Sequence, residues 1–385
     1  MRPQSYWEKA WGVQAHALTP PPAAGRADVA IVGAGFCGSW LAYFLKRAHP
    51  DLQIAILERD FLSFGASTRN AGFLSCGNVS EWLEDSRQMS WDELAATLYA
   101  RIEGVRILRR EFSHLLSPIR CGSADLDAVT DEKRDLLDKL NHQAREWGIE
   151  NLFALRQIPF AGGTRVVPFN SFDGEVDPVA VLSGLHERLR AQGVRFLWNC
   201  DVTAIGKGLV EYVSGEQSRE LSYGYGFVCT NAFARALNPN TFVRPARGQI
   251  LVTAPCETST QPCLGFYRAG YDYFRFIGKR LLVGGGRLEF KLQEDTDRIE
   301  TTEEVRGYLL DLAQSVLGHG QFQIEDHWSG IMGLRDGKHA AIGDFETPVM
   351  LDSQTEEIAG FGGWGVTLTP YVTARKVTAL RFKRN

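Results

Sequence analysis

The sequence predicts an α/β fold with at least two domains, and three observations carry this prediction. A short apolar run at residues 28–33 leads directly into a glycine-rich turn and a helical stretch. A second apolar run at residues 53–57 ends at the acid Glu58. The chain has 385 residues, which exceeds the usual size of one domain, so two domains are the natural expectation.

The glycine-rich turn has the spacing of a nucleotide-binding unit. Strand, turn, helix, strand and acid follow one another within about 30 residues, as in a Rossmann-like βαβ unit. Gly33 permits the tight turn, Gly35 lets the backbone approach a pyrophosphate, and Gly38 allows the helix to pack close to the strand. The start of the helix offers N–H groups and a positive dipole end to phosphates. The alternative is a tight βα turn that binds nothing, but strand, helix and acid all favour the functional interpretation.

Glu58 bears on which nucleotide would bind. It follows Gly38 by 20 residues, where an acid accepts hydrogen bonds from ribose hydroxyls. An acid disfavours a 2′-phosphate and so argues against NADP. The turn itself does not separate FAD from NAD.

The other elements follow from periodicity and turn signals. Thr301-x-x-Glu304 resembles a capping box that opens a helix through Leu317. A glycine cluster at residues 360–365 precedes a final helix. The remaining expected elements are helices at 91–112 and 179–192, the latter closing at Gly193, strands at 194–199, 203–205 and 226–231, and β-sheet over 242–290.

Composition excludes several classes of protein. A net charge of −4 gives no electrostatic case for nucleic acid or an anionic membrane. The seven cysteines include no C-x-x-C and the eight histidines no i, i+4 pair, so we expect neither a disulfide framework nor a metal site. No apolar run reaches the roughly 18 residues of a transmembrane helix. Residues 1–26 lack the apolar core of a signal peptide, so we expect a cytoplasmic protein.

A second segment, residues 65–73 (GASTRNAGF), follows the acid almost at once. Its small residues would let backbone N–H groups reach a cofactor, and Arg69 offers a charge to a phosphate or a flavin carbonyl oxygen. On chemistry alone, a surface turn with one solvated arginine is an equal alternative.

These residues carry a resemblance to a known family. GAGFCG…LER…FGASTRNAGF resembles the FAD-dependent D-amino-acid oxidase superfamily, in the branch of glycine oxidase, sarcosine oxidase and γ-glutamylputrescine oxidase. Four more segments agree in family order across residues 28–370, and they are GEVDPVAVLSGLHERLRAQGVRF, GFVCTNAFARAL, RPARGQILVTAP and GFGGWGVTLTP.

The resemblance implies a discontinuous FAD-binding domain and an α+β substrate-binding domain with a mixed β-sheet. We expect the FAD-binding domain at residues 28–85, 150–235 and 328–385, the substrate domain at 86–149 and 236–327, and an N-terminal extension at 1–27. The flavin performs the chemistry by taking a hydride from the carbon beside a neutral amine, so no catalytic acid–base residues are expected. The residues implied in FAD binding are Gly33, Gly35, Phe36, Cys37, Gly38, Glu58, Arg59, Ala66, Ser67, Arg69, Asn70, Ala71, Gly72, Phe73, Val202, Thr230, Asn231, Gly330, Gly362, Gly363, Trp364, Gly365, Val366 and Thr367.

The C-terminal glycine cluster has a physical role in this scheme. Glycines before a helix expose N–H groups that can stabilise negative charge on a reduced flavin. The alternative is an ordinary flexible turn, but the flanking strand and Val366–Leu368 frame the cluster well for the flavin role.

The sequence departs from the family pattern at three positions. In the segment Trp328–Gly337, Met332 stands where amino-acid oxidisers keep the arginine that binds the substrate carboxylate, and a thioether cannot replace that contact. We therefore expect that a simple α-amino acid is not the best substrate, unless Arg335 compensates. Gly330 replaces the flavin-linking cysteine of sarcosine oxidase, so FAD should be non-covalent. Thr367 replaces a lysine credited with oxygen activation, which leaves O2 or another electron acceptor open.

The substrate pocket is expected around Tyr271, Tyr273 and Arg275, with Met332 and Trp364 beside it. Alternate residues at 271, 273 and 275 share one face if they form a strand. Aromatic walls suit an amine-bearing chain, although a core aromatic stripe is about as plausible for each tyrosine alone. The main functional hypothesis is an FAD-dependent oxidoreductase acting on a primary or secondary amine. The alternatives are an amino-acid or imino-acid oxidase or dehydrogenase, with Arg335 or Arg275 binding the carboxylate, and a flavin-bound partner protein without turnover.

Overall fold

The structure is a computed structural model that describes residues 3–12, 25–113, 121–335 and 340–380. Parts of the expected N-terminal extension (13–24) and of the segment at 328–337 (Asp336 and Gly337) therefore lie outside the described residues. The chain forms two compact units. The first unit comprises Met1–Tyr6, Arg69–Asp177 and Arg247–Gly330, and the second comprises Trp7–Thr68, Pro178–Ala246 and Ile331–Asn385.

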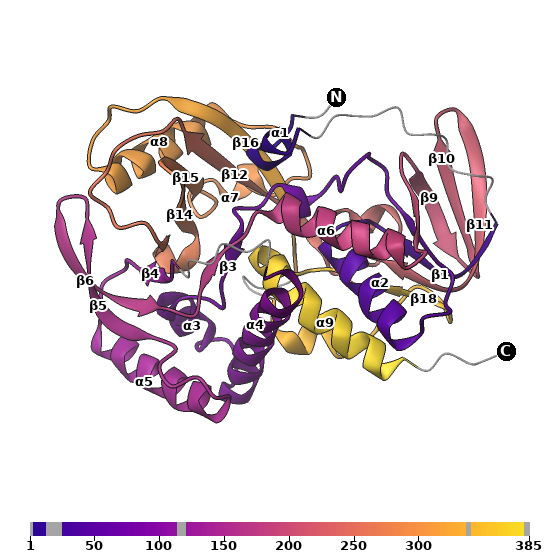
Figure 1. The fold of residues 1–385 in the computed structure, drawn as a ribbon, viewed down its shortest axis with the longest axis horizontal. Coiled ribbons are helices and arrows are strands. Elements are labelled where there is room, and N and C mark those ends of the chain that lie inside the picture. The colour runs from indigo at the N-terminus through magenta and orange to yellow at the C-terminus, as the bar shows by residue number, and fades with distance from the viewer. Residues whose placement is uncertain (1–2, 13–24, 114–120, 336–339, 381–385) are drawn as a thin grey trace. The chain divides into compact units, whose positions relative to one another are not determined.

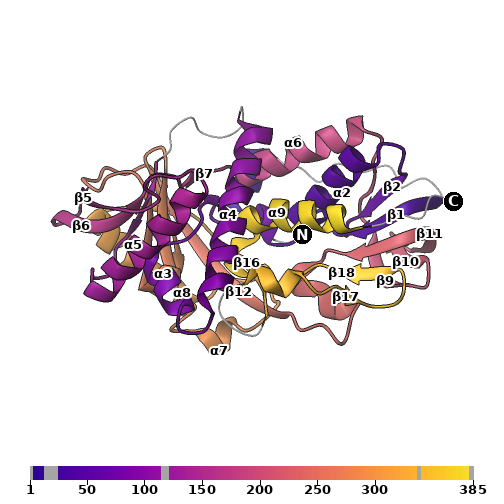
Figure 2. The same cartoon turned by 90° about the horizontal axis from the view of Figure 1, so that it is seen from below.

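The second unit is built on a largely parallel sheet (Figures 1 and 2). The strand order is β17-β18-β11-β1-β2-β8, in which β18, β11, β1, β2 and β8 run parallel. An antiparallel extension of β9 and β10 pairs with β11. The strands are β1 (Arg26–Val32), β2 (Ile54–Leu57), β8 (Arg195–Leu197), β9 (Asp201–Gly206), β10 (Leu209–Ser214), β11 (Gln217–Val228), β17 (Val349–Met350) and β18 (Thr355–Glu357).

The burial of these strands explains why they form the centre of the unit. Every residue of β2 is buried, as are the last four of β1, as expected when both faces of a parallel sheet are covered. Helix α2 packs against α9 and α6 (Figure 1). The helical elements of the unit are α1 (Tyr6–Ala10, which begins at the last residue of the first unit), α2 (Phe36–Ala48), η1 (Ala66–Thr68), α6 (Pro178–Ala191), η2 (Asn231–Ala236), η4 (Ile342–Phe345), η5 (Gly362–Trp364) and α9 (Gly365–Ala379).

The first unit contains a mixed sheet with the order β16-β12-β15-β14-β13-β4-β6-β5. Strands β12 and β16 continue from this unit into the second. A two-stranded ribbon of β3 and β7 accompanies the sheet. The strands are β3 (Phe73–Leu74), β4 (Ser123–Asp125), β5 (Ala154–Phe160), β6 (Gly163–Asn170), β7 (Gly174–Glu175), β12 (Arg244–Thr253), β13 (Leu264–Tyr267), β14 (Asp272–Ile277), β15 (Arg280–Gly285) and β16 (Ile324–Leu334).

Helices of the first unit form two hydrophobic cores. Helix α8 buries Val305, Leu309 and Ala313 against the sheet. Helices α3, α4 and α5 share a second core around Trp82 and Leu98. The helical elements are α3 (Val79–Asp85), α4 (Trp91–Phe112), α5 (Asp131–Glu146), η3 (Arg268–Gly270), α7 (Lys291–Glu294) and α8 (Glu303–Leu317). The α/β unit and the α+β unit with its mixed sheet confirm the expected fold class.

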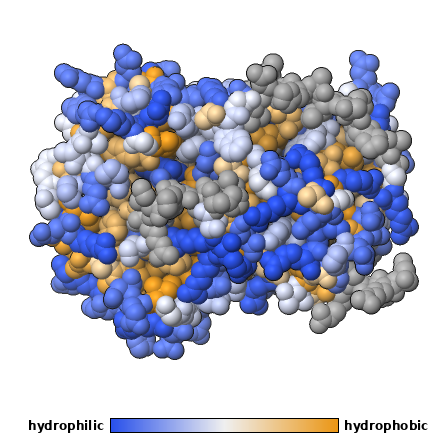
Figure 3. All heavy atoms as spheres, in the orientation of Figure 1, coloured by the Kyte–Doolittle hydropathy of each residue, from blue (hydrophilic) through white to orange (hydrophobic). Residues whose placement is uncertain are grey.

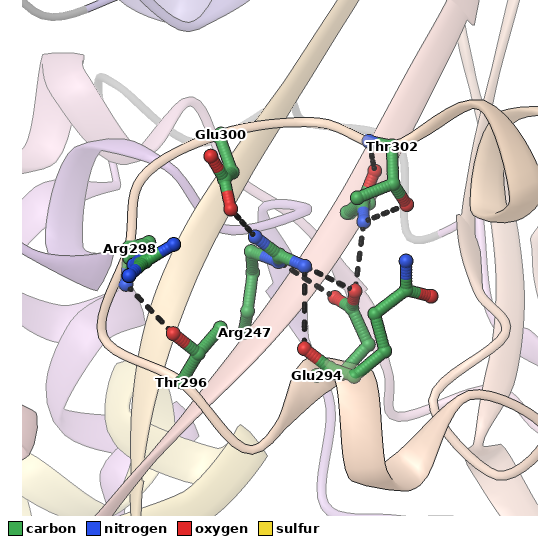
Figure 4. A network of polar contacts seen from close by, with 8 residues as sticks. Arg247, Glu294, Thr296, Arg298, Glu300 and Thr302 are labelled. Atoms are coloured by element: carbon green, nitrogen blue, oxygen red, sulfur yellow. Dashed lines mark hydrogen bonds and ion pairs between the residues drawn. The ribbon is translucent and has the colours of Figure 1, made fainter.

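The RPARGQ segment has a structural function in the first unit (Figure 4). Arg247 is buried and donates hydrogen bonds to both carboxylate oxygens of Glu294, at 3.1 and 2.7 Å. It also pairs with Glu300 at 3.0 Å. Gln249 donates to Glu294 and to the hydroxyl of Thr302. These contacts tie β12 to α7 and to the start of α8.

The same network corrects the expected capping box. The N-cap of α8 is Thr302, and the helix begins at Glu303 rather than beside Thr301. Thr302 makes no side-chain cap hydrogen bond, because its hydroxyl accepts from Gln249 while its N–H donates to Gln249 Oε1 at 3.0 Å. A residue distant in sequence thus replaces the local cap. The expected end of the helix at Leu317 is confirmed.

Candidate functional site

The glycine turn of the second unit connects β1 to α2 and requires glycine at two positions. A Cβ on Gly38 would lie 2.1 Å from the carbonyl oxygen of Gly33, so no larger residue fits where the helix meets the strand. Gly33 has a φ of +106° and lies against the carbonyl oxygen of Cys229. Helix α2 begins at Phe36 without a side-chain cap and without an acid in its first turn. Its N-terminal end therefore suits an anionic group.

Glu58 lies directly after β2 and braces this turn. Its Oε2 accepts a hydrogen bond from the backbone N–H of Ala34 at 2.9 Å, and its Oε1 accepts weaker bonds from Asp60 and Phe64. Burial raises the pKa of this carboxyl, and the backbone hydrogen bonds oppose that rise. An ionised carboxylate has lone pairs for more donors than these, so the contact to Ala34 is compatible with the expected ribose contact.

Ser67 and Arg59 complete the region around the turn. The Ser67 hydroxyl accepts a hydrogen bond from the backbone N–H of Phe36 at 2.9 Å. The same oxygen would be 2.8 Å from a Cβ on Gly35. The guanidinium of Arg59 lies over the rings of Phe64 and Phe233, at 3.7 and 4.2 Å from their centroids. Segments from β1, β2 and β11 thus meet at the carboxyl ends of parallel strands, where ligands bind in such sheets.

The C-terminal glycine loop lies at the same end of the sheet. The backbone N–H of Gly360 donates to Oδ1 of Asn231 at 2.9 Å. The thiol of Cys37, in the first turn of α2, lies 3.7 Å from the carbonyl oxygen of Ile358. The two glycine segments, more than 300 residues apart in sequence, are therefore adjacent in the second unit. We call Gly33–Gly38, Glu58, Ser67, Thr230, Asn231 and Gly360 together the glycine cradle.

Helix α9 starts at Gly365, directly after the glycine loop, as the sequence predicts. Its first turn carries no acid, and Trp364 at its N-cap makes no side-chain capping hydrogen bond. A Cβ on Gly363 would meet open space. Thr367 is buried, and its hydroxyl donates to the carbonyl oxygen of Trp364 at 3.4 Å. Like α2, this helix presents an uncapped N-terminal end.

Arg335 supports the glycine loop. Its Nε and Nη2 donate to the carbonyl oxygen of Ala359 at 3.2 and 3.0 Å. Its guanidinium also lies over the ring of Phe345, 5.1 Å from the centroid. A Cβ on Gly360 would collide with the Arg335 side chain at 2.6 Å. Met332 lies on β16, which ends one residue before Arg335, and is partly buried.

His186 is a contributor to the cradle that sequence reasoning missed. Its Nε2 lies 2.9 Å from the carbonyl oxygen of Ala34, which can only accept, so this nitrogen carries the proton. The hydroxyl of Ser39 donates to the same carbonyl at 3.1 Å. Burial lowers the pKa of His186 to about 3. The available signal was a lone histidine on the apolar face of the helix, between Leu182 and Leu189.

Arg69 follows the point where the GASTRNAGF segment enters the first unit. It is buried and donates to the carbonyl oxygens of Ser329 at 2.5 Å and of Pro3 at 2.7 Å. Its own carbonyl oxygen accepts from Nε1 of Trp328 at 3.0 Å. A Cβ on Gly330 would lie 3.2 Å from the Cβ of Arg69. Arg69 thus binds backbone groups around the Trp328–Gly330 segment instead of being a solvated surface residue.

The prediction that Tyr271, Tyr273 and Arg275 share one strand is wrong for Tyr271. Tyr271 lies before β14 with right-handed helical dihedrals, because the preceding η3 turn contains Arg268 and Ala269 at positive φ. The carboxylate of Asp127 accepts hydrogen bonds from both of their backbone N–H groups at 2.7 Å and fixes this turn. Only Tyr273 and Arg275 lie on the strand and share its face.

The predicted site residues therefore divide between the two units. The second unit holds Gly33, Gly35, Phe36, Cys37, Gly38, Glu58, Arg59, Ala66, Ser67, Val202, Thr230, Asn231, Met332, Gly362, Gly363, Trp364, Gly365, Val366 and Thr367. Val202 lies on β9, far along the sequence from the turn that joins β1 to α2. The first unit holds Arg69, Asn70, Ala71, Gly72, Phe73, Gly330, Tyr271, Tyr273 and Arg275.

Two other kinds of site are absent from the described part of the chain. No group of three or more His, Cys, Asp or Glu side chains there could hold a metal ion. No described helix is both long and apolar enough to cross a membrane. The face drawn in Figure 3 carries mostly hydrophilic residues, with smaller hydrophobic patches between them.

The glycine cradle fits a dinucleotide. Within the described residues, Thr230 has a buried hydroxyl oxygen with no hydrogen-bond partner, at the carboxyl end of β11. The uncapped starts of α2 and α9, the close approach permitted by Gly35 and the acid at Glu58 supply what a pyrophosphate and a ribose require. The fold and this cradle define the class of protein: it binds a dinucleotide in its α/β unit and has an α+β unit as well.

Comparison with known proteins narrows the class. The family model described as FAD dependent oxidoreductase matches residues 28–380. Glycine oxidase from Geobacillus kaustophilus is similar in structure, with a TM-score of 0.68, 18% sequence identity and coverage of 94% of this chain and 96% of that one. L-proline dehydrogenase from P. horikoshii has a TM-score of 0.71 at 14% identity, covering 94% of each chain. The chain belongs to the FAD-dependent oxidoreductase (DAO) family, and FAD is its cofactor.

One curated relative matches in part. The beta subunit of sarcosine oxidase from Rhodobacter capsulatus is 34% identical over 99 residues, which is 26% of this chain. The match spans only 21% of that relative's length. It supports the glycine and sarcosine oxidase branch that the motifs indicate.

Proposed function

We propose that this protein oxidises a C–N bond of a primary or secondary amine, giving an imine that hydrolyses to a carbonyl product. The observation that carries the proposal is the contact of Cys37, in the first glycine segment, with Ile358, just before the second, in a chain of the FAD-dependent family. The bond from Gly360 to Asn231 holds the second segment at the end of β11. When bound, FAD supplies a two-electron acceptor that takes a hydride from carbon.

The residues of the chain bind and orient this group. In the proposal, amides at the start of α2 hold the pyrophosphate and Glu58 accepts from the ribose. Amides of the loop at residues 362–366, at the start of α9, stabilise negative charge on the flavin. The FAD-binding residues set out above, together with the domain ranges expected from the sequence, are part of this proposal. Gly330, which carries no nucleophile, would leave the cofactor non-covalent.

The charges of the described residues favour an amine over an α-amino acid. Met332 offers no charge to a carboxylate. Arg335 and Arg275, the two candidates to replace the missing arginine, both donate to backbone carbonyl oxygens. Tyr273 provides an aromatic wall suited to an amine-bearing chain, and burial raises the pKa of its hydroxyl, which keeps it neutral.

An amino-acid or imino-acid substrate is the second candidate. Glycine oxidase and L-proline dehydrogenase, both similar in fold, act on such compounds according to their names. The third candidate is a flavin-bound partner without turnover, and the relative named as a subunit of sarcosine oxidase supports considering it.

The free cysteines of the described chain support the expected cytoplasmic location.

An anaerobic screen of flavin reduction tests these candidates. The purified yellow protein is mixed without oxygen with primary amines, secondary amines and amino acids, and the flavin absorbance is followed. Bleaching by amines in preference to the matching amino acids supports the proposal. Preference for glycine, sarcosine or D-alanine supports the second candidate, and no bleaching by any compound supports the third.

Two further measurements complete the test. Admitting air to the reduced protein shows whether O2 reoxidises the flavin, which distinguishes an oxidase from a dehydrogenase. Acid precipitation should release the flavin into the supernatant. A flavin that stays with the precipitated protein contradicts the non-covalent assignment.

A further inference from the structure

Arg275 occupies an unusual place for a residue expected to meet substrate. It lies on β14 of the first unit and is only 4% exposed. Its Nη1, which carries two hydrogens, lies within hydrogen-bond distance of three backbone carbonyl oxygens, those of Ala71 at 3.1 Å, Gly72 at 2.8 Å and Val176 at 2.9 Å. Its Nη2 lies 2.8 Å from Oε2 of Glu175.

The partners of Arg275 lie in the ribbon of β3 and β7 or directly beside it. Phe73 pairs with Glu175 in this ribbon, and Val176 donates its N–H to the carbonyl oxygen of Gly72 at 2.9 Å. Gly72 has a φ of +73°, and its N–H donates to Oδ1 of Asn70 at 2.8 Å. The guanidinium therefore fixes the carbonyl groups of a sharp turn, and with them the direction of the neighbouring N–H groups.

Tyr273 supports the same turn from the same face of β14. Two residues apart on a strand, Tyr273 and Arg275 point to one side. The ring of Tyr273 lies 5.5 Å from that of Phe73, at an interplanar angle of 73°. One face of β14 thus holds both the backbone of Ala71 and Gly72 and the side chain of Phe73.

We propose that Arg275 is a positioning residue that fixes the Asn70–Phe73 segment for flavin binding, and that it does not bind a substrate carboxylate. The inference rests on the proposed function, in which this segment contacts the flavin. A buried guanidinium already paired with Glu175 and three carbonyl oxygens would have to abandon those contacts to receive a substrate, leaving buried acceptors unpaired.

The test compares Arg275→Lys with Arg280→Lys. Lysine keeps the charge but cannot reproduce the planar fork that reaches three carbonyls and a carboxylate. Arg280, on the neighbouring strand β15, forms an ion pair with Glu325 at 2.7 Å and provides the matched control. A double variant, Arg275→Gln with Glu175→Gln, removes both charges together, so that an unpaired buried charge does not by itself cause unfolding.

The first readout is the binding of FAD to the apoprotein. For Arg275→Lys and for the double variant we expect about a tenfold increase in the dissociation constant, together with an altered visible circular dichroism of the bound flavin. Arg280→Lys should match the wild type in both. If Arg275→Lys binds FAD with wild-type affinity and spectrum, the positioning role is overturned.

The second readout separates positioning from carboxylate binding. Each protein is assayed with an N-methyl amino acid and with its amide, which differ only in the carboxylate. If Arg275 is a positioning residue, Arg275→Lys should lower kcat equally for the N-methyl amino acid and for its amide. A wild-type protein that does not oxidise the N-methyl amino acid also supports the positioning role. A rise in KM confined to the acid overturns it. A wild-type protein that binds no FAD contradicts the proposed function itself, whereas normal FAD binding by Arg275→Lys contradicts this inference alone.

Discussion

The N–H of Gly360 donates a 2.9 Å hydrogen bond to the side-chain oxygen of Asn231, which joins the loop before α9 to the end of β11. A Cβ on Gly333 would lie 2.4 Å from the same oxygen, so Asn231 is enclosed by glycines of two further segments. This arrangement makes the cradle depend on small residues throughout.

Replacing Gly38 by alanine should abolish FAD binding. The new methyl group would lie 2.1 Å from the carbonyl oxygen of Gly33, so α2 must move away from β1, at a cost of about 1–3 kcal/mol. The ratio of flavin to protein absorbance and the melting temperature should both fall. Gly307→Ala, at an exposed position of α8 where a Cβ meets nothing within 4 Å, is the control and should keep its flavin. Flavin retained by Gly38→Ala would contradict the prediction.

His186 should make the protein less stable in acid. Its pKa is about 3 in the folded chain and about 6.5 in the unfolded one, so the unfolded state binds the proton first as the pH falls. The stability that His186 contributes is complete above pH 6.5. It should fall by about 2 kcal/mol between pH 7 and pH 5, since each pKa unit corresponds to 1.36 kcal/mol.

The variant His186→Gln isolates this effect, because glutamine does not titrate and can still donate to Ala34. Urea unfolding of both proteins at pH 7 and pH 5 gives two differences in the free energy of unfolding. The advantage of the wild type over the variant should shrink at pH 5. A difference that does not change with pH would show that His186 is not held in its neutral form.

Arg335→Met should weaken FAD binding about tenfold. The carbonyl oxygen of Ala359 loses both donors of the guanidinium, and an unsatisfied buried acceptor costs about 1–3 kcal/mol. Titration of the apoprotein with FAD measures the change. An unchanged FAD affinity combined with loss of amino-acid oxidation would instead identify Arg335 as the carboxylate-binding residue.

Arg247→Met should lower the free energy of unfolding by about 3–5 kcal/mol, because the carboxylate of Glu294 is left buried and unpaired. The double variant Arg247→Met with Glu294→Gln removes the charge and keeps an acceptor for Gln249, so it should recover part of the loss. Urea denaturation of the three proteins gives the values. Equal stability of the single and double variants would mean that the buried charge is not the cause.

The sequence predicted what local spacing determines. Strand, turn, helix and acid from residues 28 to 58 form one continuous unit, and helix 91–112 has the predicted bounds because its apolar spacing is regular. Parallel pairing of β1 with β11 joins residues almost 200 positions apart, which no local pattern specifies. The family resemblance placed residues 28–85 and 150–235 in one domain but did not specify this pairing.

Side-chain partners from distant segments explain the errors and omissions. Tyr271 left the strand because Asp127, on another element, stabilises the turn before it. The capping box expected at Thr301 is absent, because the helix starts after Thr302 and the side chain of Gln249 holds this N-cap residue. In the sequence, His186 is one more residue on an apolar helix face. Its contact with Ala34 forms only in the folded chain.

The chain passes from one compact unit to the other at Tyr6, Thr68, Asp177, Ala246 and Gly330. Each unit is therefore assembled from three separate stretches of the polypeptide. A truncation that removes Trp7 from the N-terminal side, or Gly330 from the C-terminal side, takes material from both units. During synthesis the sheet of the second unit stays incomplete until β18 leaves the ribosome, more than 300 residues after β1. Closing such distant contacts is slow, so folding should depend on chaperones and on the full-length product.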